Sequence, residues 1–594
     1  MNEVNELFTK ENVEKIYVPD IVKDDLLSII EEKLKKAGFY YRVAYRVKAP
    51  DSMLDKLILK DYRRPGTENQ DKKMQDLIGI RIILYYADDV EIVKSFLDTI
   101  FSMPGVWNTT EANEYEFRAM KINGIFKLPG YLSNSLYVLE ANIRHAAILG
   151  YVGAGGTVKR PTKEGPAMVF NNVKGHKDAR VAIGVLASRK RVAALLDCKP
   201  EELGKKLYHS VDNPIAPVEY QGDAPCQQVV HKVEDPDFNL YDLVPAPTNT
   251  PDDAGPYITL GATHPDTGVH DVTIHRLCIQ GKDELSIFFT PGARHIGAMA
   301  ERAEELGQKL PISISIGVDP AIEIGSCFEA PTTPLGYDEL SVAGALRNEP
   351  VELCKCLTVN EMAIANAEYV IEGEVIPNVR VQEDQNSHTG YAMPEFPGYT
   401  GPASSQCWLI KVKAVTHREN PIMQTCIGPS EEHVSMAGIP TEASIYGMVE
   451  KAMPGRLQNV YCGSAGGGKY MAVLQFKKRE ASDEGRQRQA ALLAFSAFSE
   501  LKHVFLVDED VDCFDMNDVL WAMNTRFQGD ADIITIPGVR CHPLDPSNDP
   551  TCSSSIRDHG IACKTIFDCT VPYDQKERFK RARFMEVDPE HWLS

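Results

Sequence analysis

The chain has 594 residues, which is too long for one hydrophobic core, so length alone predicts three or four domains. Its composition, with 43% hydrophobic, 25% charged and 8% aromatic residues, is that of an ordinary globular protein. The net charge of −21 opposes nonspecific binding to nucleic acid or to an anionic membrane, so we expect neither as a partner.

The opening residues and the cysteines predict a cytoplasmic protein. No apolar run is long enough to span a bilayer, and the start, MNEVNE, lacks the basic-then-apolar pattern of a secretion signal. The 14 cysteines are scattered, and only Cys354 and Cys356 are close in sequence. In a long acidic chain without a signal, we expect reduced thiols, several of them serving packing.

Residues 1–148 form a first segment. A helix is predicted at 21–37 from its apolar spacing, and a buried strand at 77–86 follows Asp76. Between them lies a group of basic and hydroxyl side chains: Arg46, Lys48, Ser52 and Lys56. Such a group before an acid-capped strand suits nucleotide phosphates and magnesium, and a solvated basic face is the alternative.

This group, with DLIGIR at 76–81, resembles the synthetase domain of the RelA/SpoT family, which transfers pyrophosphate to guanine nucleotides. The resemblance implies that the basic residues bind the donor nucleotide and that Asp76 binds the metal. The family also needs a Glu-x-Gln strand with a second acidic ligand, where this chain offers only EANIR at 140–144. We therefore expect a truncated domain without nucleotide synthesis.

The remainder of the chain predicts an α/β protein of several domains. Strands at 167–170 and 180–186 and a helix opening at Pro200 favour a small α/β domain. Short period-2 segments punctuated by glycine and proline favour a barrel or sandwich. A helix at about 441–452 then leads to a helix at 487–502 and a strand at 503–507. The predicted domains are 149–217 (α/β), 218–427 (barrel or sandwich), 428–452 (linking helix) and 453–594 (α/β).

An acidic cluster at 508–512, DEDVD, has the composition of a calcium-binding loop. It lacks the glycine and the final glutamate of an EF-hand loop. We interpret it as a strand end followed by helix caps.

A stretch near the middle of the chain, 271–295, concentrates polar side chains. Its first residues, DVTIHR, alternate as a half-buried strand does, so Asp271, Thr273 and His275 share one face. Arg276 then faces the other side unless a bulge intervenes. A second strand at 285–290 leads into PGARH, so two strands could bring an Asp, an Arg and a His together. A surface hairpin with scattered charges is the alternative.

Three longer strings accompany this stretch: GPAMVFNNV (165–173), TNTPDDAGPY (248–257) and GPSEEHVSMAGIP (428–440). With them, the sequence from about residue 151 resembles the UbiD family of prenylated-flavin decarboxylases, in its gallate, protocatechuate and vanillate group. The resemblance narrows the barrel to a split barrel of the flavin-reductase kind. It implies decarboxylation of a small aromatic acid by a homo-oligomer, with prenylated flavin mononucleotide supplied by a partner flavin prenyltransferase.

The resemblance also assigns a metal site and a cofactor site. Asp271, His295 and Glu339 would bind manganese or another divalent ion at the cofactor phosphate, with potassium nearby. The family more often has asparagine at the position of Asp271, and aspartate is an equally hard ligand. The expected cofactor contacts are Thr273, Ile274, His275, Arg276, Arg294, His295, Glu339 and Lys469. Lys469 follows three glycines that would let backbone amides approach a phosphate, and a flexible loop is the alternative.

Two residues are expected to carry the chemistry. Arg276 matches the family's catalytic arginine, whose guanidinium would hold the substrate carboxylate by two parallel hydrogen bonds. Glu383 would pair with this arginine and, in its neutral form, deliver a proton to the ring carbon after carbon dioxide leaves.

The second glutamate of the family's Glu-Arg-Glu set has no clear counterpart. The segment 383–390, EDQNSHTG, is one residue shorter than the common pattern and has Asn386 or Ser387 where the acid usually stands. Asp384 and His388 are the candidates to replace it.

The join between the two resemblances, at about 130–150, lacks residues of both families. Neither the end of the synthetase domain nor the helix and strand that usually open hydroxybenzoate decarboxylases is recognisable there. A natural fusion and a spliced or damaged gene both fit this pattern. Three functions therefore stay open: an active decarboxylase, an inert fusion and a nucleotide pyrophosphotransferase.

Overall fold

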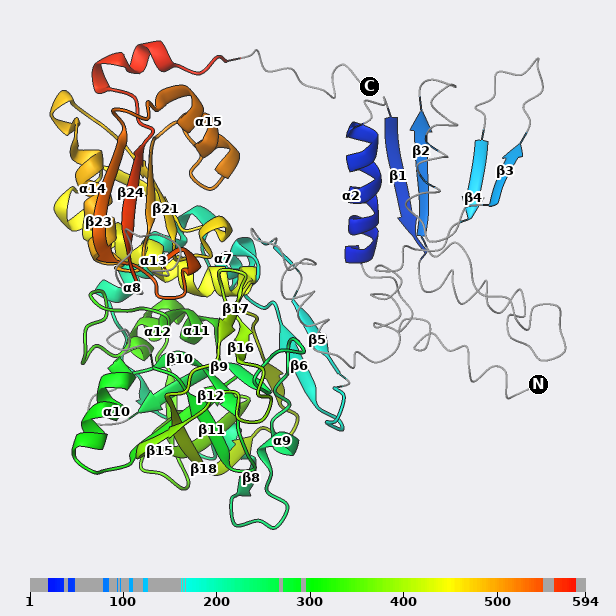
Figure 1. Cartoon of the computed structure of the whole chain (residues 1–594), viewed down its shortest axis with the longest axis vertical. Coiled ribbons are helices and arrows are strands. Elements are labelled where there is room, and N and C mark those ends of the chain that lie inside the picture. The colour runs from blue at the N-terminus through cyan, green and yellow to red at the C-terminus, as the bar shows by residue number, and fades with distance from the viewer. Residues whose placement is uncertain are drawn as a thin grey trace. The chain divides into compact units, whose positions relative to one another are not determined.

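A computed structural model describes the parts of the chain on which the following account rests (Figure 1). These are residues 20–36, 41–48, 78–84, 93, 97, 106–110, 121–125, 162, 164–165, 167–171, 173–265, 271–289, 295–548 and 560–583. The chain divides into two compact units, Met1–Arg144 and His145–Ser594. None of the helices in these residues has the length and apolarity needed to cross a bilayer.

The first unit contains one described helix and two antiparallel strand pairs. Helix α2 (Asp20–Lys36) packs on β1 (Tyr41–Val47), which pairs with β2 (Ile78–Leu84). The apolar face of α2 is buried: Leu26, Leu27, Ile30 and Leu34. Strand β3 (Val106–Thr110) pairs antiparallel with β4 (Lys121–Ile125). The helix at 21–37 and the strand at 77–86 are thus confirmed, whereas Ser52, Lys56 and Asp76 lie outside the described residues.

The second unit begins with a small sheet, one strand of which comes from much later in the chain. Its order is β19-β6-β5, and β19 is parallel to β6. The strands are β5 (Met168–Phe170), β6 (Arg180–Ile183) and β19 (Ile422–Gln424). Helix α7 (Arg189–Leu195) follows, then a 3-10 turn (Pro200–Glu202) and α8 (Leu203–Asp212), so the helix predicted to open at Pro200 is present.

Six antiparallel strands close into a barrel. Their order is β11-β10-β9-β12-β15-β18, and the pairing of β11 with β18 closes the ring. The strands are β9 (Tyr257–Pro265), β10 (Thr273–Ile279), β11 (Glu284–Ile287), β12 (Leu310–Ile316), β15 (Tyr369–Val381) and β18 (Cys407–His417). The long strand β18 also carries β8 (Val229–Lys232). Of the two architectures that the period-2 pattern left open, the chain adopts the barrel.

Helices and short strands connect the barrel strands. The helices are α9 (Leu240–Leu243), α10 (His295–Glu305), α11 (Pro320–Gly325) and α12 (Glu339–Arg347). The short strands are β7 (Val218–Glu219), β13 (Glu352–Lys355), β14 (Met362–Ile364), β16 (Tyr391–Pro394) and β17 (Thr400–Pro402). Strands β16 and β17 form an antiparallel hairpin of their own, outside the ring.

Helix α13 (Glu431–Ala452) lies between the barrel and the C-terminal sheet (Figure 1). Its first turn is capped by Ser430, whose hydroxyl accepts from the His433 N–H at 3.2 Å. The helix therefore begins ten residues before the predicted start at 441, and it runs through Pro440, a residue type that usually breaks a helix. Its buried Glu442 binds both Nη atoms of Arg189 at 2.9 and 2.8 Å, which ties α13 to α7.

The C-terminal domain is a mixed five-stranded sheet of order β20-β21-β22-β24-β23 with two helices. The strands are β20 (Leu457–Tyr461), β21 (Met471–Phe476), β22 (His503–Asp508), β23 (Ile533–Arg540) and β24 (Ile561–Asp568), and the helices are α14 (Arg486–Ala497) and α15 (Met516–Arg526). The strand at 503–507 is confirmed, and the helix at 487–502 ends early, at Ala497.

The acidic cluster at 508–512 follows β22 and leads to α15. Arg526 binds Asp508 at 2.9 Å and Asp510 at 2.6 Å, and Asp515 caps α15 by accepting from the Asn517 N–H. These contacts fit the interpretation as a strand end and helix caps. The cysteines that the structure describes are free thiols, and most of them are buried.

Candidate active site

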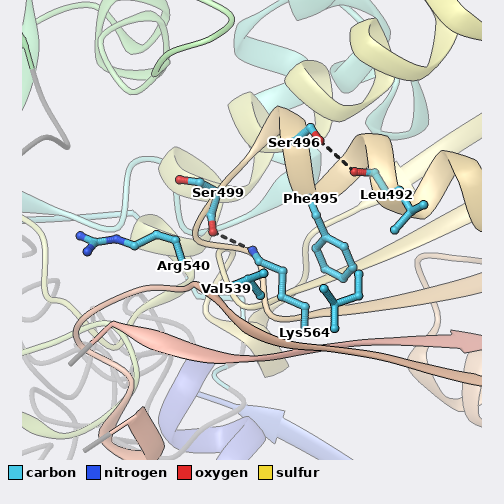
Figure 2. Close-up of a pocket in the computed structure, with 8 residues that line it drawn as sticks. Leu492, Phe495, Ser496, Ser499, Val539, Arg540 and Lys564 are labelled. Carbon is cyan, nitrogen blue, oxygen red and sulfur yellow. Dashed lines mark hydrogen bonds between the residues drawn. The ribbon is translucent and has the colours of Figure 1, made fainter. Parts of the chain in front are cut away.

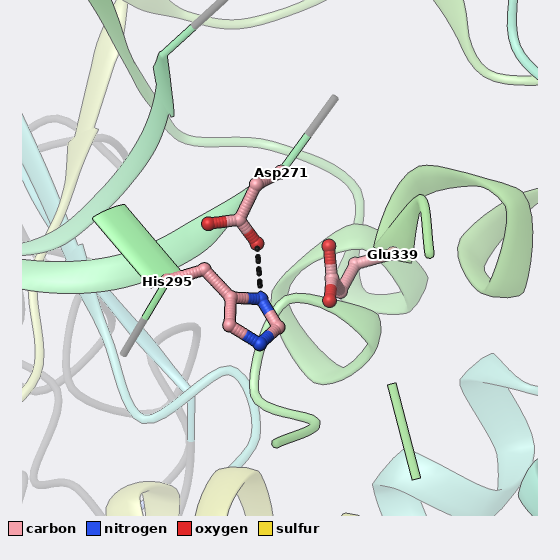
Figure 3. A group of neighbouring side chains, drawn as sticks. All are labelled: Asp271, His295 and Glu339. Atoms are coloured by element: carbon pink, nitrogen blue, oxygen red, sulfur yellow. Dashed lines mark ion pairs between the residues drawn. The ribbon is translucent and has the colours of Figure 1, made fainter. Parts of the chain in front are cut away.

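Asp271, His295 and Glu339 meet at one point beside the barrel (Figure 3). One ligand atom from each lies within 4.8 Å of the other two, and His295 Nδ1 is 3.5 Å from Asp271 Oδ1. The backbone N–H of Val272 donates to Glu339 Oε2 at 3.3 Å. The structure thus brings together the three residues that the sequence assigned to a metal.

Local packing explains why these side chains converge. Asp271 precedes β10, His295 is the first residue of α10, and Glu339 is the first residue of α12. Each is followed by a fully buried apolar residue: Val272, Ile296 and Leu340. Burial of these neighbours holds the backbone in place next to each polar side chain, which fixes the direction in which that side chain points.

The electrostatics of this cluster fit a divalent cation. Burial, and then the negative charge of Asp271, raise the pKa of Glu339 to about 9. The two buried carboxylates are hard oxygen donors of the kind that manganese and magnesium accept, and the imidazole adds a nitrogen donor of the kind that transition metals accept. A cation between them would relieve the repulsion that disfavours the charged form of Glu339.

Strand β10 carries the expected cofactor contacts Thr273, Ile274 and His275. Thr273 and His275 are buried while Ile274 and Arg276 are half-buried, so the predicted alternation holds. The register with β9 shifts between His275 and Leu277, where β9 has an extra residue opposite Arg276. Arg294 lies outside the described residues.

Arg276 lies between two carboxylates. Its Nη2 is 3.3 Å from Glu383 Oε1, as expected from the sequence, and its Nη1 contacts Glu395 Oε1. Glu383 follows the end of β15, and Glu395 follows the end of β16. The result is a Glu-Arg-Glu arrangement assembled from three separate parts of the barrel domain.

Glu383 is almost fully buried, and both of its carboxylate oxygens accept hydrogen bonds. Its Oε1 accepts from the hydroxyl of Tyr257 at 3.0 Å, and its Oε2 accepts from the backbone N–H of Ser404 at 3.0 Å. Burial is the main cause that raises the pKa of Tyr257, so this hydroxyl keeps its proton and donates it to the carboxylate. Tyr257 ends the TNTPDDAGPY string, to which the sequence analysis assigned no catalytic role.

The second acid is Glu395, which sequence analysis missed. Asp384 points into its own loop, where it accepts from Gln382 Nε2 and from the Gly390 N–H, both at 2.7 Å. Asn386 donates to Tyr241 and to the Gln280 carbonyl. Glu395 lies beyond the segment 383–390, in which the family pattern places the second acid. The signal was the Pro-Glu-Phe-Pro-Gly string at 394–398, which marks a hairpin end with an acid in it.

Lys469 lies near this arrangement but faces carboxylates. Its Nζ is 3.1 Å from Glu500 and 3.7 Å from Glu329. The preceding glycines serve close packing: a Cβ on Gly468 would lie 2.9 Å from the Val434 carbonyl and 3.0 Å from the Gly438 nitrogen in α13. Gly467 and Gly468 also have positive φ angles, of 62° and 78°. A phosphate contact by Lys469 therefore stays a prediction.

A cavity of about 350 Å³ in the C-terminal domain is separate from these residues (Figure 2). It lies between α14, β23 and β24, and its lining is mostly apolar. Lys564 borders it and donates to the Ser499 and Leu501 carbonyls at 2.7 and 2.5 Å. Burial lowers the pKa of Lys564 to about 8.

Sequence profiles of three domains match the chain in succession. They are the 3-octaprenyl-4-hydroxybenzoate carboxy-lyase N-terminal domain at 154–211, the Rift-related domain at 218–431 and the C-terminal domain at 434–569. The gallate decarboxylase of Lactiplantibacillus plantarum is 56% identical over 454 residues, which cover 76% of this chain and 93% of that protein. The chain belongs to the UbiD family of carboxy-lyases.

Solved UbiD-family structures have the same fold. An apo 3,4-dihydroxybenzoic acid decarboxylase from Enterobacter cloacae is similar with a TM-score of 0.71 and 56% identity, over 77% of this chain and 98% of that one. An evolved dimeric form of the UbiD-class enzyme HmfF from Pelotomaculum thermopropionicum, in complex with prenylated FMN, is similar with a TM-score of 0.63 and 33% identity. That match covers 74% of this chain and 91% of HmfF.

Proposed function

We propose that this UbiD-family carboxy-lyase removes carbon dioxide from a hydroxylated aromatic acid, such as gallate or protocatechuate, and releases the phenol. The observation that carries the proposal is the Glu383–Arg276–Glu395 arrangement, in a barrel domain that also contains three side chains able to bind a metal ion. The 56% identity to a gallate decarboxylase supports this substrate class.

The reaction needs an electron sink that no side chain provides. When the ring–carboxyl bond breaks, the electron pair remains in the ring plane, and bound prenylated FMN would accept it. The complex of HmfF with prenylated FMN supports this cofactor. Asp271, His295 and Glu339 would hold a divalent ion, which we propose to be manganese, where it can bind the cofactor phosphate. Potassium nearby stays a prediction.

Arg276 would orient the substrate. A guanidinium binds a carboxylate by parallel hydrogen bonds, which fixes the direction of the bond to be broken. Glu383 and Glu395 in turn hold the plane of the guanidinium from two sides. This positioning supplies the entropic part of the rate enhancement.

We assign the proton transfer to Glu395 and a positioning role to Glu383, which differs from the expectation based on the sequence. The two oxygens of Glu383 already accept from Tyr257, Ser404 and Arg276, so three of the roughly four acceptor sites of this carboxylate are occupied by donors that favour its charged form. Glu395 is more exposed, at 14% against 3% for the two side chains. It can therefore carry a proton and deliver it to the ring carbon after carbon dioxide leaves.

The decisive experiment is a substrate panel on the full chain co-expressed with a flavin prenyltransferase. Gallate, protocatechuate, vanillate and 4-hydroxybenzoate are each incubated with the purified flavin-bound protein, and carbon dioxide and phenol are measured. Turnover of at least one acid is expected. Flavin-bound protein that converts none of them contradicts the proposal.

Two other candidates have separate readouts. An inert fusion predicts aggregation or protein without a flavin absorption band, and the 93% coverage of the gallate decarboxylase argues against it. A nucleotide pyrophosphotransferase predicts product from ATP and GTP. The RelA/SpoT likeness behind that candidate stays a prediction, because several of its key residues, Asp76 among them, lie outside the described residues.

A further inference from the structure

The acid Glu395 lies at the tip of the β16–β17 hairpin. The Glu395 N–H donates to the Tyr399 carbonyl at 2.8 Å, and the Gly398 N–H donates to the Glu395 carbonyl at 2.9 Å. These bonds close a tight loop, which leaves β16 at Pro394 and enters β17 at Thr400. The hairpin is not part of the closed barrel ring, so the ring alone does not fix the position of this loop.

The neighbouring residue, Phe396, is buried among aromatic rings. Its ring stacks on His433 with a centroid distance of 5.4 Å and an angle of 7°. The edges of Tyr470 and His542 meet it at 5.0 and 4.7 Å. On another side Gly467 comes so close that a Cβ there would lie 2.6 Å from Phe396 Cδ2. We call these four residues the Phe396 cage.

The Phe396 cage belongs to other parts of the molecule than the hairpin does. His433 lies in the first turn of α13, and the remaining three residues belong to the C-terminal domain. Glu395 contacts Arg276 of barrel strand β10, and the next side chain enters the cage. Consecutive residues of one short loop are therefore fastened to two different domains.

We propose that Phe396 is a positioning residue that holds the Glu395 carboxylate against Arg276 by anchoring the hairpin tip in the C-terminal domain. The two backbone hydrogen bonds of Glu395 are internal to the hairpin, and outside the hairpin Gly428 packs on the backbone of Pro394 and Glu395, so the Phe396 ring is the side chain that ties the tip to the C-terminal domain. Loss of the ring would remove this tie and allow the loop that carries the acid to shift relative to the guanidinium. The catalytic part of this inference rests on the proposed function, and the structural part does not.

The test compares three variants of the full chain by hydrogen exchange and by steady-state kinetics. Phe396→Ala removes the ring, and Phe396→Leu keeps apolar bulk if the alanine variant does not fold. Gly467→Ala crowds the cage from the C-terminal domain and leaves the hairpin sequence unchanged. Phe505→Ala is the control, since that ring stacks on Phe567 at 4.7 Å in the same domain but away from the cage.

Phe396→Ala is expected to raise amide exchange in the peptide 391–402 and to lower kcat by about 10²-fold, because a small displacement of a reacting group has an effect of this size. KM should change little, and the fall in kcat should be smaller for Phe396→Leu than for Phe396→Ala. Gly467→Ala should produce the same exchange signature in the hairpin, although the substitution is in another domain. Phe505→Ala should leave both readouts near wild type.

Unchanged protection of peptide 391–402 in both folded Phe396 variants would overturn the anchor. Raised exchange with an unchanged kcat would overturn the positioning role. If the unaltered protein converts no hydroxybenzoate, the proposed function fails, and the exchange measurements still decide whether Phe396 anchors the loop.

Discussion

Arg276 uses its two terminal nitrogens for different partners: Nη2 pairs with Glu383 and Nη1 with Glu395. One partner is buried and held by a tyrosine and a backbone amide, and the other lies on a hairpin tip. A single guanidinium therefore connects a fixed carboxylate with one whose position depends on a loop.

Glu395→Gln should abolish most of the activity. The amide keeps the size of the side chain but has no acidic proton to deliver, so we expect kcat to fall by about 10²–10⁴-fold with little change in thermal stability. Steady-state kinetics on the preferred hydroxybenzoate measure this. Glu383→Gln is the comparison, and it should also lower the thermal midpoint, because its buried amide group would face the Ser404 N–H donor. An E395Q enzyme within threefold of wild type would exclude Glu395 as the acid.

Asp271→Asn and Glu339→Gln should affect metal binding unequally. Asparagine retains an oxygen donor at position 271, whereas removal of the Glu339 charge leaves a weaker ligand set. In wild type, manganese at 100 times its Kd should stabilise the protein by about 2.7 kcal/mol, seen as a rise in the thermal midpoint. We expect the rise to persist in D271N and to vanish in E339Q and in His295→Ala. Equal responses from all three variants and the wild type would place the metal elsewhere.

Tyr257→Phe removes one hydroxyl from the buried environment of Glu383. The lost hydrogen bond to a charged acceptor should lower the free energy of unfolding by about 1.5–3 kcal/mol and should lower kcat more than it raises KM. Urea unfolding and kinetics provide the two measurements. Tyr369→Phe, a buried tyrosine on β15 outside the site, is the matched control. Equal effects of the two substitutions on kcat would remove Tyr257 from the catalytic arrangement.

His503 in β22 should make the C-terminal domain sensitive to acid. Burial, and then Lys502, lower its pKa from 6.5 to about 4. Between these values the unfolded chain binds a proton that the folded one does not, so the free energy of unfolding falls as the pH drops from 6.5 towards 4. His503→Gln should flatten this part of the pH dependence in urea titrations, and His209→Gln, on the exposed side of α8, should not. A slope that is unchanged in H503Q would refute the assignment.

The sequence predicted the site residues that lie at the starts of regular elements, and it did not predict those that reach the site only through tertiary folding. Asp271, His295 and Glu339 were identified from resemblance, and each begins or precedes a regular element, where patterns are easiest to read. Tyr257 joins the site because the barrel closes, and Glu395 joins it because a hairpin folds back. The string at 394–398 marks the hairpin turn, but nothing local shows that its acid reaches Arg276. The same reason hid β19, which pairs in parallel with β6 far earlier in the chain. The predicted start of α13 at 441 was ten residues too late; capping by Ser430 and burial of the helix outweigh the one hydrogen-bond donor that Pro440 lacks.

The hairpin that carries Glu395 is attached to the barrel domain, but its two strands are not strands of the closed barrel. It can therefore be exchanged between relatives without a change in the six barrel strands, which include the strand that carries Arg276 and begins next to Asp271. A chimera with a transplanted segment 391–402 would inherit its turnover rate from the donor and its metal affinity from the host. Engineering of speed and engineering of cofactor loading are, in this architecture, separable tasks.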